Sequence, residues 1–166
     1  MKKLFLFVAL LATVFTQNSI AQLVPDNRED TTNQAQLTQL LHAYFQVKNA
    51  LVEGNSTTTA LQAQSFLKIA NGISNRTISE GSRNALVKDA GAISETKDIN
   101  KQRAVFANLS TNMYALAKSL KLATEPIYYD YCPMKKVYWL SSDKAIKNPY
   151  YGSAMLTCGK VIDTIK

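Results

Sequence analysis

The sequence has few of the residues that enzymes use for catalysis. Histidine occurs once, at His42, and no motif around it supplies a nucleophile with a base. The chain also has no Cys-x-x-Cys redox pair, no glycine-rich phosphate loop and none of the usual spacings of zinc ligands. His42 lies well off the apolar stripe of its predicted helix, so we expect an exposed surface residue. These shortages lead us to expect a protein that is not an enzyme.

Long hydrophobic runs are equally scarce. The one present, Leu4 to Phe15, is too short to span a bilayer and follows the basic pair Lys2-Lys3. Ser19-Ile20-Ala21 then gives the small-x-small pattern that signal peptidase recognises. We therefore predict that residues 1–21 are a signal peptide. The mature protein is expected to be periplasmic or secreted, with no integral membrane segment.

Acidic residues are fewer than basic ones, and the formal net charge is +7. Lys2 and Lys3 of the predicted signal peptide supply two of these charges, and the other lysines are scattered. An exported protein rarely meets nucleic acid, and scattered charge is typical of a solvated surface. We therefore expect no nucleic-acid partner.

Helical periodicity covers most of the predicted mature chain. Residues 22–32 are polar and carry Pro25, which predicts a flexible leader. Beyond it, a single domain is predicted over 33–166. Apolar residues recur at helical spacing in four segments of this domain, 33–53, 56–71, 82–96 and 98–121. Short loops between such segments predict an up-and-down bundle of three to four helices.

The last segment, 127–165, differs in composition from the helical part. It holds six of the eight tyrosines and the single tryptophan, and its prolines exclude a long helix. Residues 127–131 and 137–140 are β-prone, and 155–165 is predicted to pair back on the first of these. The predicted fold class is mainly α, a bundle with a small C-terminal β-containing cap.

Both cysteines lie in this cap, and each has a methionine close by. The two short runs are Cys132-Pro133-Met134 and Met155-Leu156-Thr157-Cys158. Thiolates and thioethers are the soft ligands that select Cu(I), and the adjacent lysines favour the thiolate form. This pattern predicts a metal site made of Cys132, Met134, Met155 and Cys158, with copper as Cu(I).

A disulfide between Cys132 and Cys158 is the alternative. An oxidising compartment favours such a bridge, which would stabilise the domain by about 3–4 kcal/mol. The protein would then be a non-catalytic binding module whose aromatic cap takes a protein or a glycan. A third hypothesis joins the two, with the disulfide as the metal-free form. Every version requires the two cysteines to lie close together.

Several motifs resemble those of a known bacterial domain of unknown function. They are Tyr131-Cys132-Pro133-Met134, Tyr138-Trp139-Leu140, Asn148-Pro149-Tyr150-Tyr151-Gly152 and Met155-Leu156-Thr157-Cys158-Gly159, with Tyr44 and Arg103 in the helical part. That domain occurs alone in exported proteins and is also appended to periplasmic adaptor subunits of copper and silver efflux pumps. The resemblance implies a small helical domain linked to heavy-metal handling, with a metal ion and a periplasmic efflux component as partners. The Cys-Pro-Met run is similar to metal-binding segments of those adaptors, in which a histidine occupies the place of Lys135.

Overall fold

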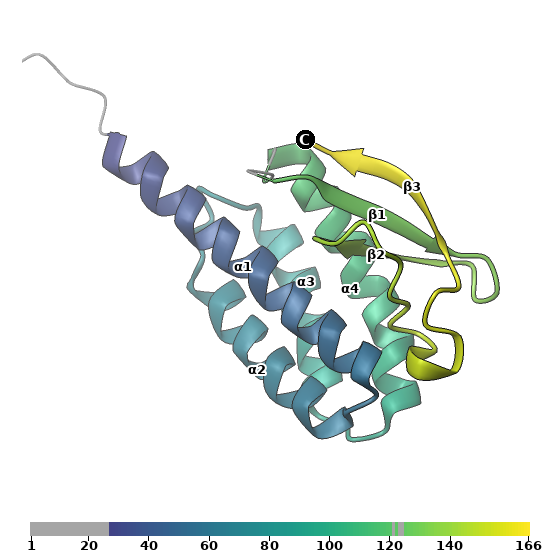
Figure 1. Cartoon of the computed structure of the whole chain (residues 1–166). Coiled ribbons are helices and arrows are strands. Elements are labelled where there is room, and N and C mark those ends of the chain that lie inside the picture. The colour runs from purple at the N-terminus through teal and green to yellow at the C-terminus, as the bar shows by residue number, and fades with distance from the viewer. Residues whose placement is uncertain (1–26, 121, 123–124) are drawn as a thin grey trace, which may run out of the picture.

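Four helices form the larger part of the fold in this computed structural model, which describes residues 27–120, 122 and 125–166. The helices are α1 (Asn27–Glu53), α2 (Ser56–Gly72), α3 (Glu80–Ser94) and α4 (Ile99–Leu120). Each helix packs against the next one along the chain, as an up-and-down bundle requires (Figure 1). The mainly helical fold class is confirmed. The predicted signal peptide lies outside the described residues.

Side chains cap the starts of three helices. The side chain of Asn55 accepts a hydrogen bond from Thr58 N, and that of Ser79 accepts one from Ser82 N. The Asp98 carboxylate accepts a hydrogen bond from Asn100 N at 2.9 Å. Short polar side chains at these positions satisfy the unpaired N–H groups of a first turn.

Helix α1 begins before the point that the sequence pattern indicated. The prediction of a flexible leader over 22–32 is wrong for residues 27–32, which form the first turns of α1, while 22–26 lie outside the described residues. Thr31 and Thr32 are exposed, so no apolar periodicity marks this stretch. The helix continues there because extending an existing helix adds one hydrogen bond for each residue fixed.

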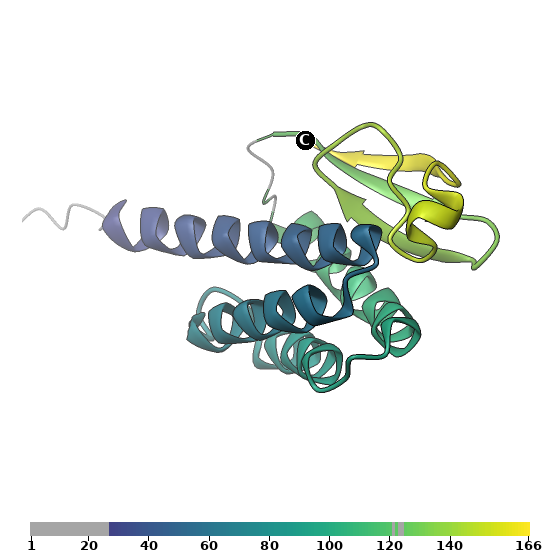
Figure 2. The ribbon, with the colours of Figure 1, turned by 60° about the horizontal axis from the view of Figure 1, so that its bottom comes forward.

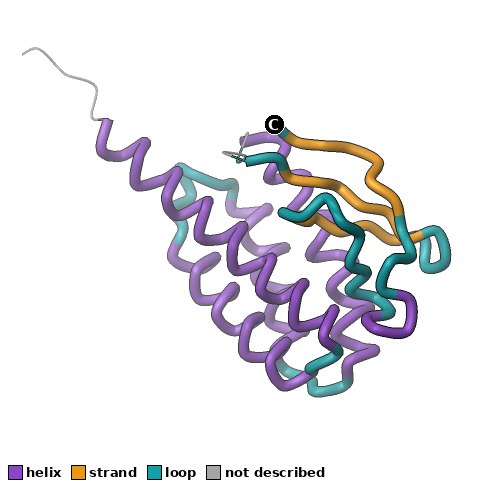
Figure 3. Tube along the Cα trace, viewed as in Figure 1, coloured by secondary structure: helices purple, strands orange, loops and turns teal. Residues whose placement is uncertain are grey.

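A three-stranded antiparallel sheet follows the bundle (Figure 3). Its strands are β1 (Ile127–Cys132), β2 (Val137–Ser141) and β3 (Lys160–Ile165), in the spatial order β2-β1-β3. The predicted return strand is confirmed from Lys160 onward. Of the residues predicted as strand before it, Met155 is the last residue of a short 3-10 helix, η1 (Gly152–Met155), and 156–159 form a turn and loop. Gly152, the first residue of η1, has a φ of 59°, a left-handed conformation that glycine adopts readily.

Tyrosines attach the sheet to the bundle. The sheet lies beside α1 and α4, away from α2 and α3 (Figure 2). The buried Tyr44 hydroxyl on α1 bonds to Ser110 Oγ of α4 at 2.7 Å and accepts a hydrogen bond from Leu140 N of β2 at 3.0 Å. Tyr114 of α4 stacks on Tyr129 of β1, with ring centroids 3.7 Å apart. One hydrophobic core therefore runs from the helices into the sheet.

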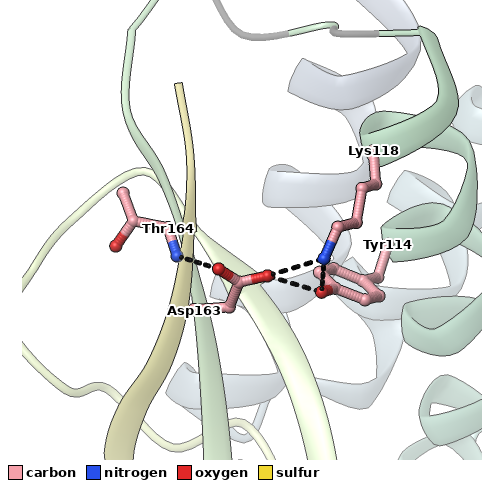
Figure 4. Close-up of polar contacts among 4 residues, drawn as sticks. All are labelled: Tyr114, Lys118, Asp163 and Thr164. Atoms are coloured by element: carbon pink, nitrogen blue, oxygen red, sulfur yellow. Dashed lines mark hydrogen bonds and ion pairs between the residues drawn. The ribbon is translucent and has the colours of Figure 1, made fainter.

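A polar cluster ties β3 to α4 (Figure 4). The Tyr114 hydroxyl donates a hydrogen bond to Asp163 Oδ2 at 2.6 Å, and Lys118 Nζ lies 3.1 Å from the same oxygen. Thr164 N donates to the other carboxylate oxygen at 2.8 Å. The hydrogen bonds from Tyr114 and Lys118 hold the pKa of Asp163 below its ordinary value. This partly exposed cluster holds the last strand, β3, against α4 of the bundle.

Candidate metal centre

The structure brings the two cysteines together at one end of the sheet. Cys132 is the last residue of β1 and is fully buried, and Cys158 lies just before β3 and is partly buried. Antiparallel pairing of Tyr131 with Lys160 places the two residues side by side. Both cysteines are free, and the Cys132 thiol lies close enough to Cys158 to affect its pKa. Desolvation, together with the neighbouring thiol, raises the pKa of Cys158.

Asn148 holds the segment that carries Cys158. Its side-chain Nδ2 donates to the Cys158 carbonyl oxygen at 2.6 Å, and its backbone N donates to Leu156 O at 2.8 Å. The remaining side-chain oxygen accepts a hydrogen bond from Tyr150 N at 2.8 Å. Asn148 is fully buried, so these bonds are shielded from water. The Asn-Pro-Tyr motif therefore positions one of the two thiols.

Gly159 lets the chain pass close to the single tryptophan directly after Cys158. Its φ is 157°, and a Cβ added there would lie 2.8 Å from Trp139 Cη2 and 3.1 Å from Tyr131 O. Trp139 is fully buried. A larger residue would push the chain away from β1 and separate the two thiols.

Arg103 of α4 holds the start of the segment that leads to Cys158, at Pro149, against the helical bundle. Its Nε donates to Pro149 O at 2.9 Å, and its Nη2 donates to Leu51 O at 3.1 Å in the last turn of α1. Burial lowers the pKa of Arg103. A guanidinium at a helix C-terminus adds a charged donor to the last carbonyls, and here Leu51 O also accepts a hydrogen bond from Gly54 N at 3.2 Å. In sequence this arginine has no visible partner, because its partners are backbone carbonyls far along the chain.

The two methionines lie at the surface near the thiol pair. Met134, in the β1–β2 turn, is 62% exposed, and Met155, in η1, is 41% exposed. The Met155 carbonyl oxygen accepts a hydrogen bond from Cys158 N at 3.1 Å. Within the described residues, no group of three or more His, Cys, Asp and Glu side chains could hold a metal ion. A metal site here would therefore combine the two thiols with thioethers.

His42 lies elsewhere, as its place on the helix indicated. It is exposed on α1, and its Nε2 lies 3.3 Å from Gln46 Nε2. It lines a cleft with Phe45 and Ile127, at the start of β1, whereas Cys132 ends that strand. His42 is therefore not one of the residues that the structure gathers around the thiols.

A buried polar cluster lies on the same strand as Cys132 and was not predicted from the sequence. Asp130 is fully buried, and its cross-strand partner is Trp139. Neither the two Asp130 carboxylate oxygens nor Trp139 Nε1 has a hydrogen-bond partner among the described residues. Desolvation raises the pKa of Asp130 to about 7, although the nearby Lys48 opposes this shift. Burial also lowers the pKa of Lys48, which is 3% exposed.

Replacing Lys48 with methionine should make stability more sensitive to alkaline pH. The folded protein keeps the Asp130 proton up to a pKa of about 7, whereas the unfolded chain loses it near 4, so ionisation lowers stability as pH rises between these values. Without the Lys48 charge the folded pKa of Asp130 rises further. The variant should therefore lose about 1–2 kcal/mol more at pH 8 than at pH 5.5, where the carboxyl is protonated in either protein.

Urea unfolding followed by circular dichroism at the two pH values measures this difference. Lys68→Met is the matched control, because Lys68 is exposed on α2. The control should change stability equally at both pH values. An equal effect of the Lys48 substitution at pH 5.5 and pH 8 would contradict the pairing with Asp130.

The fold and the site together define a helical-bundle domain whose C-terminal sheet carries two neighbouring thiols at one end. Residues 40–125 match a family described as a protein of unknown function, DUF3347, and the chain belongs to this family. The matched region ends before β1, so both cysteines lie outside it. No curated protein and no solved structure was found to match the chain. Among the described helices, none has the length and hydropathy that a membrane crossing needs.

Proposed function

We propose that the protein binds a soft metal ion, Cu(I), through Cys132 and Cys158. The observation that carries this proposal is the close approach of the two cysteines through the pairing of β1 with β3, with one thiol buried and one partly accessible. Two thiolates neutralise the charge of a Cu(I) ion and are the donors that this soft cation prefers. Cys158 provides the route of entry, and Cys132 holds the ion away from water.

The exposed thioethers support the same chemistry. Methionine is normally a residue of protein cores, as Met113 is on α4, where it is fully buried. Met134 and Met155 are instead exposed, two and three residues from Cys132 and Cys158, in positions that core packing does not explain. A thioether needs no deprotonation before it binds, so it can complete the coordination of an ion held by thiolates.

The proposed role is that of a periplasmic carrier or an efflux-adaptor-like partner in heavy-metal handling. The predicted signal peptide supports an exported protein, and the resemblance of the Cys-Pro-Met run to adaptor segments supports the link to copper. Membership of the family assigns no activity by itself. Within this role the protein would pass the ion on rather than transform a substrate.

A disulfide-stapled binding module remains the second candidate. The same close approach of the two cysteines is compatible with a bridge once the protein is exported. Tyr131 and Tyr138 pack with ring centroids 4.8 Å apart beside the cysteines, and both are partly exposed. They would form the platform on which a protein or glycan binds.

Counting free thiols with and without Cu(I) separates the two candidates. The reduced protein should have two reactive thiols, and one equivalent of Cu(I) should protect both of them under a mild reductant. Native mass spectrometry should then show one copper ion per chain. If the thiols of the reduced protein stay equally reactive after copper is added, the copper proposal fails and the stapled module is the better account.

Met134 and Met155 should each make a small contribution to the affinity for Cu(I), whereas the two thiolates should supply most of it. Met134→Leu and Met155→Leu should each weaken Cu(I) binding by less than about tenfold, because a neutral thioether contributes less than a thiolate. Zn²⁺ binding should be nearly indifferent to either change. Met113→Leu is the matched control, since Met113 is buried in the bundle and should leave copper affinity unchanged. A loss as large as that of a cysteine variant would show that the thiolates are not the main donors.

A further inference from the structure

The end of the sheet that carries the thiol pair also has an exposed apolar surface. Met134, Met155 and Leu156 are 62%, 41% and 39% exposed, which places them among the few large apolar side chains at the surface of the described structure. The same segments carry three exposed lysines, Lys135 and Lys136 in the β1–β2 turn and Lys160 in β3. These six residues are called the docking face below.

The stretches of chain that carry the docking face contain no free carboxylate. Residues 131–142 and 144–162 contain no aspartate or glutamate. Asp143, between them, is paired with Lys147 at 2.8 Å, and Asp130 is buried beneath the sheet surface. The positive charge of the face is therefore available to a partner.

The turn that presents two of these lysines has a constrained backbone. Lys136 has a φ of 56°, and its backbone N donates a hydrogen bond to Cys132 O at 2.8 Å. A non-glycine residue in this left-handed conformation costs about 1 kcal/mol, and the exposed lysine side chain is not needed for packing. Lys135 Nζ lies 5.5 Å from the centre of the Tyr151 ring, which links the turn to the segment that leads to Cys158.

We propose that the docking face binds an acidic partner protein that exchanges Cu(I) with the thiol pair, an inference that rests on the proposed copper function. Charge complementarity favours an acidic surface, since it would pair with lysines that no carboxylate of their own segments neutralises. The part-buried Cys158 can release its ion only to another sulfur donor that approaches closely, and a protein supplies such a donor whereas a lipid surface does not. The face is small, so the complex should be short-lived and fast to form at low salt.

Docking can be measured without copper, with two synthetic peptides as probes. One peptide carries glutamates around two Met-x-x-Met pairs, and the other has lysine at each glutamate position. Titration of the reduced ¹⁵N-labelled protein with the acidic peptide should shift amide signals of residues 134–136 and 153–160, and the basic peptide should not. Equal shifts with both peptides, or shifts confined to the helices, would overturn the proposal.

Transfer is then measured with the acidic peptide carrying one Cu(I), using quenching of the single tryptophan in a stopped-flow instrument. The triple variant Lys135→Glu, Lys136→Glu, Lys160→Glu should accept copper at least about tenfold more slowly at low salt, and the difference should shrink at high salt. Lys68→Glu, Lys97→Glu, Lys101→Glu is the charge-matched control, because these three lysines are exposed on or beside the helices. Equal slowing in both triple variants would mean that only net charge matters, which overturns a specific face.

Two further outcomes separate this inference from the proposed function. If the acidic peptide docks on the face but the protein never takes up copper, the proposed function fails and the exchange fails with it, while the docking face itself stands. If vesicles rich in phosphatidylglycerol bind the face and the acidic peptide does not, the face contacts an anionic membrane instead and the partner-protein proposal is overturned.

Discussion

Replacing Cys158 with serine should lower the affinity of the reduced protein for Cu(I) by more than about a hundredfold. Residues that merely orient a metal ligand already change affinity by about 10- to 100-fold, so loss of a thiolate donor should exceed this range. A serine hydroxyl stays protonated and is a hard donor, which Cu(I) disfavours. Cys158 is the cleaner of the two cysteines to change, since Cys132 is fully buried and Cys132→Ser would also place a hydroxyl in the core.

Competition with a coloured Cu(I) chelator under a mild reductant measures this affinity. Thr157→Ala is a control at the neighbouring exposed position and should bind as the wild type does. The pKa of Cys158 is raised, so copper must displace a proton and the affinity of the wild type should fall as pH falls. Wild-type affinity in Cys158→Ser would rule out the thiol pair as the metal site.

The disulfide candidate makes the opposite prediction for the metal-free protein. If Cys132 and Cys158 are bridged in the exported form, adding reductant should lower its stability by about 3–4 kcal/mol, and no copper should be needed for function. The copper candidate expects reduction to create the competent state. Thermal unfolding with and without reductant therefore complements the chelator titration.

The helices could be predicted from the sequence because their signals are local. Apolar spacing located all four, and Asn55 and Asp98 marked two of the starts as caps. The first turns of α1 escaped prediction, since the exposed Thr31 and Thr32 carry no periodic signal. The return of the last strand onto β1 was predictable from β-propensity and from the two matching runs of sulfur residues. Its start was not, because η1 depends on contacts with α1 and α4.

Residues that act across long sequence distances were the hardest to assign. Arg103 looks isolated in sequence, yet it reaches carbonyls of Leu51 and Pro149 that no side-chain motif could indicate. Lys48 and Asp130 are buried near each other because α1 faces the sheet there, which requires the tertiary fold. A signal was present for Lys48, since it lies one residue from Val47 and four from Tyr44 on the apolar side of its helix.

Gly152→Ala should destabilise the protein by about 3 kcal/mol or more. The φ of 59° at Gly152 costs an alanine about 1 kcal/mol. The added Cβ would lie 2.8 Å from Arg103 Nη2 and 2.8 Å from Val52 O. Either the backbone moves away from α1, or the guanidinium loses its hydrogen bonds to Leu51 O and Pro149 O. A part-buried guanidinium left without its hydrogen bonds adds about 1–3 kcal/mol to this cost.

Gly81→Ala is the matched control for this substitution, because nothing lies within 4 Å of its Cβ position in the first turn of α3. It should leave stability unchanged or raise it by up to about 1 kcal/mol, as urea unfolding would show. In Gly152→Ala the displaced segment also carries Cys158, so the buried Cys132 thiol should react faster with a thiol reagent below the unfolding transition. If Gly152→Ala unfolds at the same urea concentration as Gly81→Ala and its thiols stay equally protected, the anchoring of this segment by Arg103 does not control the thiol pair.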